Sequence, residues 1–215
     1  MKPLHGLYAI TPEALVRGDA GTLLAAVAAA IRGGAVLIQY RDKWRAPAER
    51  PALARALRET CHAGGGRLII NDDVELAAAV GADGVHLGRS DGSIAAARAR
   101  LGSAALIGAS CQDSLERARE AITAGADHVA FGRFFASTTK PDAPAAALET
   151  LSLAKQSLPV PICAIGGITP ANARQVIAAG ADLVAAVDGV FGARDVEAAA
   201  RAYGRAFAEA APRVV

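Results

Sequence analysis

Hydrophobic residues along this chain occur in short runs of strand length, and each run ends in polar residues. Leu68–Ile70 and Val85–Leu87 are two such runs, and the Ala-rich segment Val74–Val80 between them has the length of a helix. A strand, a helix and a second strand in this order form a right-handed crossover with parallel strands. The polar residues after each run are therefore expected at the carboxyl ends of neighbouring strands, where parallel α/β folds bind ligands.

A repeated motif extends this strand–helix pattern along the chain. Gly-Ala-Asp, followed by one residue and Val, occurs at Gly81–Val85, Gly125–Val129 and Gly180–Val184, and a looser form stands at Gly33–Val36. In each case an Ala-rich segment ends at a glycine, the common residue at the C-terminal end of a helix. A strand is then expected to begin two or three residues later.

The pattern predicts eight strands, at Leu7–Ile10, Val36–Tyr40, Leu68–Asn71, Val85–Leu87, Leu106–Ser110, Val129–Gly132, Ile162–Ile165 and Leu183–Val187. Helices are expected between them, the clearest at Thr22–Arg32, Ala48–Ala63, Ser114–Ala124, Pro170–Ala179 and Val196–Glu209. Eight parallel strands alternating with helices close into a (β/α)₈ TIM barrel of the α/β class, here one domain over residues 1–215. The alternative is an open doubly wound sheet, but no Gly-x-Gly-x-x-Gly follows the first strand.

Composition narrows the classes of function. The chain is 53% hydrophobic with a mean hydropathy of +0.28, yet it has no run of about 18 apolar residues that could span a membrane. The first residues lack the features of a signal peptide, and the cysteines (Cys61, Cys111 and Cys163) are widely spaced, which favours a cytoplasmic protein with reduced thiols. A net charge of +2 gives no nucleic-acid signature. We expect neither a membrane nor a nucleic acid as a partner.

Charged residues follow three successive strands. Arg41 and Lys43 come after the second strand, Asp72 after the third and Asp91 after the fourth. Two carboxylates at adjacent strand ends favour a hard cation such as Mg²⁺, which takes its remaining oxygen ligands from water and phosphate. The alternative for Asp72 is a place at the start of the next helix, where the dipole favours an acid. Asp73 is the better candidate for that place.

The loop after the seventh strand has the sequence Gly166-Gly167-Ile168-Thr169-Pro170. Two glycines allow backbone amides to approach a ligand, while Thr169 can cap the next helix and Pro170 suits its first position. Free amides and a helix dipole form a phosphate cradle, which barrels often place after strands seven and eight. The alternative is a tight turn that needs glycine only for its geometry.

Three further residues have structural interpretations. His86 lies in an apolar strand, so we expect a hydrogen-bonded core histidine. Cys111 has no histidine partner near it in the pattern and is not expected to act as a nucleophile. Trp44 is expected to pack against the barrel rim, with a lid over a ligand as the alternative.

The predicted barrel mouth fits two phosphorylated ligands bound at once, one of them through Mg²⁺. Pyrophosphate that is held by a metal and by lysines such as Lys43 and Lys140 is a good leaving group, because its developing charge is already neutralised. The sequence shows no conspicuous His–Glu base pair. This is consistent with a substitution at carbon that needs no strong base.

These motifs together resemble one family. In order along the chain they are QYRDK, LIINDD, GVHLGRSD, the STTK loop and AIGGIT, and the match runs from Leu7 to about Phe191. They resemble thiamine-phosphate synthases, also called thiamine-phosphate pyrophosphorylases. The resemblance implies the coupling of 4-amino-2-methyl-5-hydroxymethylpyrimidine diphosphate to a thiazole phosphate, carboxylated or not, with release of pyrophosphate. It also implies a dissociative mechanism through a pyrimidinylmethyl cation.

The resemblance assigns residues to each ligand. The pyrimidine diphosphate would be held by Gln39, Tyr40, Arg41, Asp42, Lys43, Asn71, Ser110 and Lys140. The thiazole phosphate would face Ser137, Thr138, Thr139, Gly166, Gly167, Val187 and Asp188. Asp72 and Asp91 would bind Mg²⁺, and the implied catalytic residues are Arg41, Lys43, Lys140 and Ser110.

Two residues depart from the family pattern, and two rival functions remain open. Asp188 stands where serine is common, and its carboxylate is expected to turn away from the phosphate; Arg133 stands where proline is common. One rival is a related thiazole tautomerase, which would lack the diphosphate and metal residues. The other is a non-catalytic sensor of a phosphorylated ligand. A homodimer is a further expectation from the resemblance.

Overall fold

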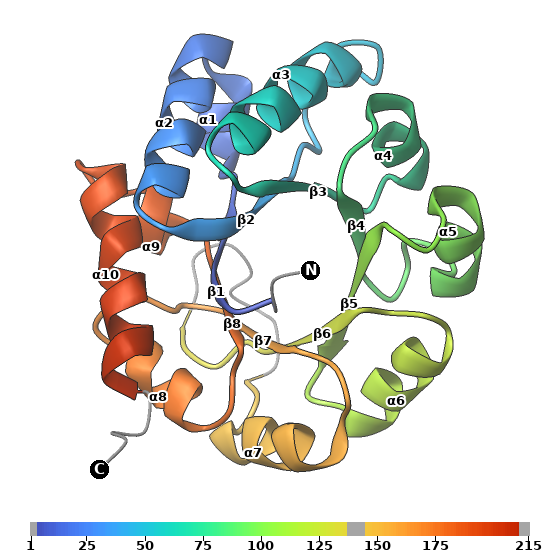
Figure 1. Cartoon of the computed structure of the whole chain (residues 1–215), viewed down its shortest axis with the longest axis vertical. Coiled ribbons are helices and arrows are strands. Elements are labelled where there is room, and N and C mark those ends of the chain that lie inside the picture. The colour runs from blue at the N-terminus through green and yellow to red at the C-terminus, as the bar shows by residue number, and fades with distance from the viewer. Residues whose placement is uncertain (1–3, 137–144, 211–215) are drawn as a thin grey trace.

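The computed structural model describes residues 4–136 and 145–210, which form a closed barrel of parallel strands surrounded by helices (Figure 1). The strands follow one another around the barrel in chain order: β1 (Gly6–Ile10), β2 (Ala35–Tyr40), β3 (Arg67–Asn71), β4 (Gly84–Leu87), β5 (Leu106–Gln112), β6 (His128–Phe131), β7 (Ile162–Ile165) and β8 (Leu183–Ala186). Pairing of β1 with β8 closes the sheet. The predicted TIM barrel is confirmed, and the open sheet is wrong.

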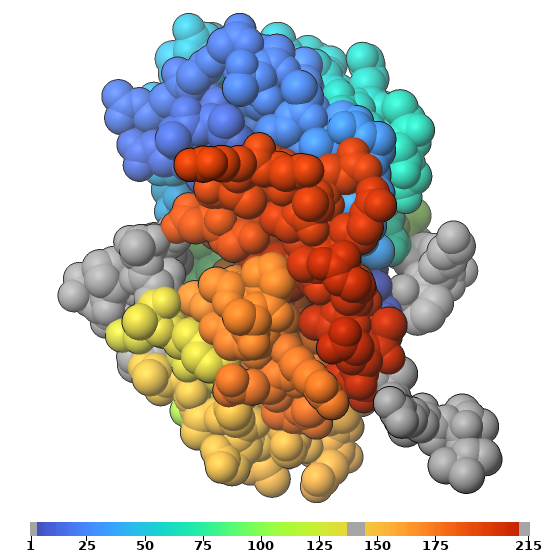
Figure 2. Space-filling view, turned by 90° about the vertical axis from the view of Figure 1, so that its left-hand side faces the viewer, coloured from blue at the N-terminus to red at the C-terminus, as the bar shows by residue number. Residues whose placement is uncertain are grey.

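The helices cover the outside of the barrel. They are α1 (Glu13–Arg17), α2 (Ala20–Arg32), α3 (Arg50–Ala63), α4 (Val74–Val80), α5 (Ile94–Leu101), α6 (Leu115–Thr123), α7 (Leu148–Ser157), α8 (Ala173–Ala178), α9 (Asp188–Phe191) and α10 (Val196–Ala210). The last long helix, α10, packs against both α2 and α8, which closes the ring of helices around the barrel (Figures 1 and 2). No helix in the described ranges is long and apolar enough to cross a membrane.

The Gly-Ala-Asp repeat has a structural role at the end of the barrel where the strands begin. The carboxylates of Asp83, Asp127 and Asp182 accept hydrogen bonds from the amides of Leu68, Ile107 and Ile162 respectively, each near or at the start of the preceding strand. Each carboxylate also pairs with a basic side chain, from His62, Arg98 and Lys155 respectively. The motif therefore joins neighbouring strands at their amino ends, opposite to the mouth.

Two apolar layers hold the barrel together. One fills the inside, with Tyr8, Leu37, Ile69 and Cys163 among its members, and the other lies between the strands and the helices. The three cysteines are buried and free of disulfides, as expected for reduced thiols. The inner layer also holds polar groups, because His86 and His128 on β4 and β6 both approach Gly108 on β5.

Alanine in place of Gly108 should lower the free energy of unfolding by about 1–3 kcal/mol, the usual cost of overpacking a core. Its Cβ would lie less than 3.0 Å from ring nitrogens of both His86 and His128, which are rigid and buried. Urea denaturation measures the change. Gly204→Ala on α10 is the matched control: no atom lies within 4 Å of its added Cβ, so stability should rise by roughly 0.5–1 kcal/mol. Equal stability of Gly108→Ala and the native protein would contradict this account of the inner layer.

Candidate functional site at the carboxyl ends of the strands

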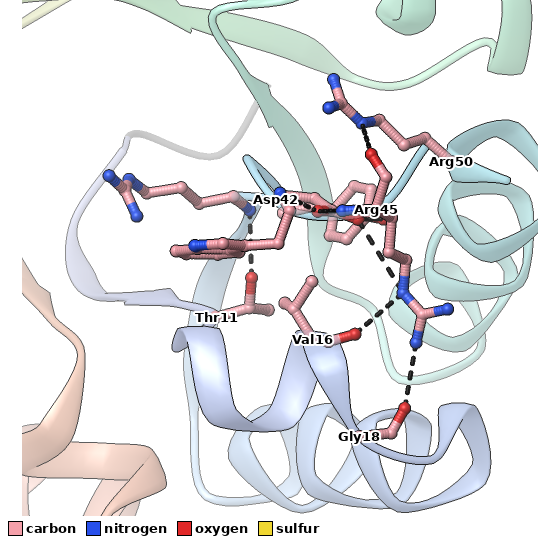
Figure 3. Close-up of polar contacts among 9 residues, drawn as sticks. Thr11, Val16, Gly18, Asp42, Arg45 and Arg50 are labelled. Carbon is pink, nitrogen blue, oxygen red and sulfur yellow. Dashed lines mark hydrogen bonds and ion pairs between the residues drawn. The ribbon is translucent and has the colours of Figure 1, made fainter. Parts of the chain in front are cut away.

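The loop after β2 is organised by the side chain of Asp42. Its carboxylate accepts hydrogen bonds from the amides of Trp44 (3.0 Å) and Arg45 (2.9 Å) and from the hydroxyl of Tyr40 (2.6 Å). Burial alone would raise the pKa of Asp42, but these hydrogen bonds hold it below its ordinary value. The Arg45 guanidinium donates to the carbonyls of Val16 and Gly18, which ties the loop to the neighbouring segment (Figure 3).

This arrangement gives the side chains of Tyr40 and Asp42 a role in the structure of the loop. Tyr40 and Asp42 were expected to hold the pyrimidine diphosphate, but both side chains are buried and bonded to one another within the loop. They shape the loop, and their expected part in holding the pyrimidine diphosphate stays a prediction. Within β2, period-two alternation separates Tyr40, which packs in the layer between strands and helices, from Gln39.

Arg41 and Trp44 lie together at the rim. The Arg41 amide donates to the hydroxyl of Thr11 at the end of β1 (3.0 Å), and its guanidinium stands 5.4 Å from the centre of the Trp44 ring. Trp44 packs against the outer apolar layer. The expected rim position of Trp44 is confirmed, and its role as a lid stays untested.

Lys43, Asp72 and Asp91 form a charged cluster across three loops. The Lys43 ammonium is 2.9 Å from Oδ2 of Asp72, and the Asp91 carboxylate accepts from the Gly88 amide at 2.9 Å. Burial and the neighbouring Asp91 raise the pKa of Asp72, with Lys43 opposing them. Burial by itself would raise the pKa of Asp91. Hydrogen bonds from Asp72 and from the Gly88 amide outweigh burial and keep this pKa below its ordinary value. The expected proximity of the two acids is confirmed.

The residues of this cluster fit a divalent cation. Two interacting carboxylates repel one another unless a proton or a cation lies between them, and the neighbouring Asp91 adds to the effect of burial in raising the pKa of Asp72. Asp72 also has a positive φ of 64°, in the left-handed region, which few residues other than glycine, asparagine and aspartate adopt. No group of three or more His, Cys, Asp or Glu side chains arranged for a metal occurs within the described ranges. A site for Mg²⁺ does not need one, since Mg²⁺ keeps several waters.

Inside the barrel, polar side chains lie below this cluster. Gln39 donates through Nε2 to the Tyr8 hydroxyl (2.8 Å), and Nε2 of His86 lies 2.9 Å from the Ser110 hydroxyl. Ser110 itself is exposed, and Asn71 is partly buried and pairs with His86 in the sheet. His86 is the hydrogen-bonded core histidine that was expected. Sequence reasoning missed Tyr8, whose apolar surroundings in the pattern gave no sign of a polar contact.

The loop after β7 is a close backbone crossing. Gly166 and Gly167 have φ of 102° and 63°, and a Cβ at either would collide with the segment 133–136 after β6. Both glycines are therefore required by geometry, as the alternative reading held. The loop could also bind a phosphate through its backbone amides, because no hydrogen bond within the described ranges uses the amides of Gly167 and Ile168.

The predicted cap of the next helix is wrong. Thr169 does not cap α8, which begins at Ala173 and not at Pro170. The Asn172 side chain instead accepts from the Thr169 amide (2.8 Å) and donates to the Gly167 carbonyl (3.0 Å), which inserts a turn before the helix. Asp73, in contrast, caps α4 as expected by accepting from the Leu76 amide.

The β8 loop lies beside the β7 loop. The Tyr203 hydroxyl on α10 donates to the Ile168 carbonyl (2.9 Å), and Gly189 passes so close that a Cβ there would meet both. Val187 precedes α9 and Asp188 is its exposed first residue. The thiazole-side residues Ser137, Thr138 and Thr139, and the catalytic candidate Lys140, lie outside the described residues.

A closed α/β barrel with charged side chains gathered at the carboxyl ends of β2, β3 and β4 defines the class of the protein as a TIM-barrel enzyme. A family model described as thiamine monophosphate synthase matches residues 7–190. The chain belongs to this family of thiamine-biosynthesis transferases. The resemblance seen in the motifs is thereby confirmed.

Individual relatives agree with the family. Thiamine-phosphate synthase of Methylococcus capsulatus is 57% identical over 199 residues, which cover 93% of this chain and 88% of the relative. The enzyme of the same name from an Azoarcus species is 52% identical over 95% of this chain and 98% of its own. Among solved structures, thiamine phosphate pyrophosphorylase from Pyrococcus furiosus superposes with a TM-score of 0.86 at 35% identity, covering 96% of this chain and 97% of that one.

Proposed function

We propose that the enzyme couples 4-amino-2-methyl-5-hydroxymethylpyrimidine diphosphate to 4-methyl-5-(2-phosphoethyl)thiazole and releases pyrophosphate, with Mg²⁺ as its cofactor. The observation that carries the proposal is the cluster of Lys43, Asp72 and Asp91, in which a lysine and a pair of acids meet at adjacent strand ends. Neither a thiazole tautomerase nor a ligand sensor would require the two metal-binding acids Asp72 and Asp91. The synthase names of relatives more than 50% identical support the same choice.

The side chains suggest how the reaction proceeds. Asp72 and Asp91 would hold Mg²⁺, which neutralises charge on the leaving diphosphate. Lys43, exposed at the rim, would bind the same diphosphate and stabilise it more strongly as the C–O bond breaks. Arg41 at the rim would hold a second side of it. The pyrimidinylmethyl cation left behind would be attacked by the thiazole nitrogen, a step that requires no base.

Below the rim, Ser110 would contact the pyrimidine, with its hydroxyl oriented by the bond to His86. On the far side, the amides near Gly167 and Val187 would face the thiazole phosphate, and the exposed Asp188 carboxylate would turn away from it. Like charges about 4 Å apart at an effective dielectric near 20 repel by about 4 kcal/mol, which is the reason for that orientation.

The test is the release of pyrophosphate by the purified protein. Both substrates with Mg²⁺ should give equal amounts of pyrophosphate and thiamine phosphate, while either substrate alone or excess chelator should give neither. A parallel reaction with the carboxylated thiazole shows which form is used. Binding of both ligands without pyrophosphate release would contradict the proposal and favour the sensor, and isomerisation of the thiazole alone would favour the tautomerase. The cytoplasmic location, the homodimer and the absence of a nucleic-acid partner stay predictions.

A further inference from the structure

The Asn172 side chain joins two backbone groups of the loop after β7. Its Nδ2 donates to the Gly167 carbonyl at 3.0 Å, and its Oδ1 accepts from the Thr169 amide at 2.8 Å. A carbonyl can only accept a hydrogen bond and an amide N–H can only donate one. The two partners therefore fix which end of the Asn172 side-chain amide faces each of them.

The bond to Gly167 also sets the direction of the next backbone amide. The Gly167 carbonyl and the Ile168 N–H belong to one planar, trans peptide group, so they point in opposite directions. Asn172 lies in the turn before α8, on the side of the helical layer. Because the carbonyl is held toward that turn, the Ile168 N–H points away from it.

The Ile168 amide makes no hydrogen bond to any described residue. Its residue is also fixed in place, since the Ile168 side chain is 3% exposed and the Ile168 carbonyl accepts from the Tyr203 hydroxyl at 2.9 Å. A backbone N–H that is held in one direction without a partner costs free energy unless water or a ligand accepts from it. Such an amide is a preorganised donor for an anion.

We propose that Asn172 is a positioning residue for the phosphate of the thiazole substrate. By holding the Gly167 carbonyl toward the helical layer, Asn172 turns the Ile168 N–H toward the mouth of the barrel, where the phosphate accepts a hydrogen bond from it. This role rests on the proposed function, since it concerns the thiazole phosphate. The direction of the donor is thus set by a side chain that does not touch the substrate.

The test compares steady-state constants of the native enzyme and Asn172→Ala. Without Asn172 the Gly167–Ile168 peptide can rotate, and loss of one hydrogen bond to a charged phosphate should raise the KM for the thiazole phosphate about ten-fold or more. The kcat and the KM for the pyrimidine diphosphate should stay nearly native, because the lost bond is equally strong before and during the reaction. An unchanged KM for the thiazole phosphate in folded Asn172→Ala, or an equal rise in both KM values, would overturn the inference.

Ser114→Ala is the matched control for the loss of a side-chain to backbone bond at this end of the barrel. The Ser114 hydroxyl accepts from the amide of Arg117, three residues away, at the start of α6. The spacing is the same as that between Asn172 and the Thr169 amide. Both KM values should stay native in this variant, and a rise equal to that of Asn172→Ala would overturn the inference.

Tyr203→Phe separates the direction of the peptide from the rigidity of the loop. It frees the Ile168 carbonyl but leaves the Gly167 carbonyl bonded to Asn172. The KM for the thiazole phosphate should therefore rise less than in Asn172→Ala. An equal rise would mean that any loosening of the loop has the same effect, and the specific role of Asn172 would be refuted.

The Ile168 N–H can also be deleted without changing a side chain. Incorporation of the α-hydroxy analogue of isoleucine at position 168 replaces the amide by an ester, which should raise the KM for the thiazole phosphate about ten-fold. The ester should add little in the Asn172→Ala background, where the N–H has already lost its direction. A further ten-fold rise there would overturn the inference. If Asn172→Ala does not fold, the ester alone decides, and a native KM would overturn the inference.

These outcomes are distinguishable from a failure of the proposed function. If the native enzyme does not couple the two substrates, the proposed function fails, and the role of Asn172 fails with it. If coupling occurs but the KM for the thiazole phosphate responds neither to Asn172→Ala nor to the ester, only the role of Asn172 fails.

Discussion

Replacing Asp91 with asparagine should lower turnover at limiting Mg²⁺ by about 100-fold or more, since even residues behind a metal ligand typically contribute about 10–100-fold to metal affinity. Asp91 and Asp72 are the two acids of the cluster, and Lys43 already pairs with Asp72. Asparagine keeps an oxygen that can accept from the Gly88 amide. The fold should therefore persist, and the loss should appear as a higher Mg²⁺ requirement.

The measurement is the rate of pyrophosphate release over a range of Mg²⁺ concentrations. Asp73→Asn is the matched control, because it removes the same charge one residue from Asp72 and keeps a residue that caps α4 well. That variant should retain nearly native activity and Mg²⁺ dependence. Native activity of Asp91→Asn at limiting Mg²⁺ would refute the metal assignment.

Glutamine in place of Lys43 should slow the chemical step by about 10²–10³-fold, the usual effect of losing one group that stabilises developing charge. The interaction strengthens as the diphosphate leaves, so the single-turnover rate should fall more than the affinity for the substrate. Rapid-quench measurement of a single turnover, with the enzyme in excess over the pyrimidine diphosphate, isolates this step.

The barrel provides a control pair of nearly equal exposure at its opposite end. Lys43 and Asp72 have side chains 51% and 23% exposed, and Lys155 and Asp182 have side chains 53% and 20% exposed. Lys155→Gln breaks the second pair at the amino ends of the strands and should leave the single-turnover rate unchanged. If Lys43→Gln turned over as fast as Lys155→Gln, Lys43 would have no role in the departure of the diphosphate.

The alternation of apolar runs and Ala-rich segments predicted the barrel because both signals are local. Ile162–Ile165 is a strand with the predicted bounds, and Val74–Val80 is a helix with the predicted bounds. The ends of helices that depend on side chains elsewhere in a loop were harder to predict from the sequence. Asn172 inserts a turn before α8, and the short α9 after β8 has no sequence signal long enough to predict.

The sequence also determined which residues stand near the mouth, since every strand of a parallel barrel delivers its next residues to the same end. Only the structure shows which way each side chain of a loop points. The Asp42 carboxylate accepts hydrogen bonds from the amides of Trp44 and Arg45 within its own loop, while Lys43 pairs with Asp72 in the next loop.

The contacts between strands were decided only by the tertiary structure. Lys43 with Asp72, Gln39 with Tyr8 and His86 with Ser110 each join different strands or their loops. Such pairs depend on the register between strands and on closure of the barrel, and neither is encoded in the residues around any one of them. The sequence by itself determined the fold and the chemical types of group at its mouth. The tertiary structure decided which of those groups meet, because hydrogen bonds and ion pairs require side chains to come within a few ångströms across the sheet.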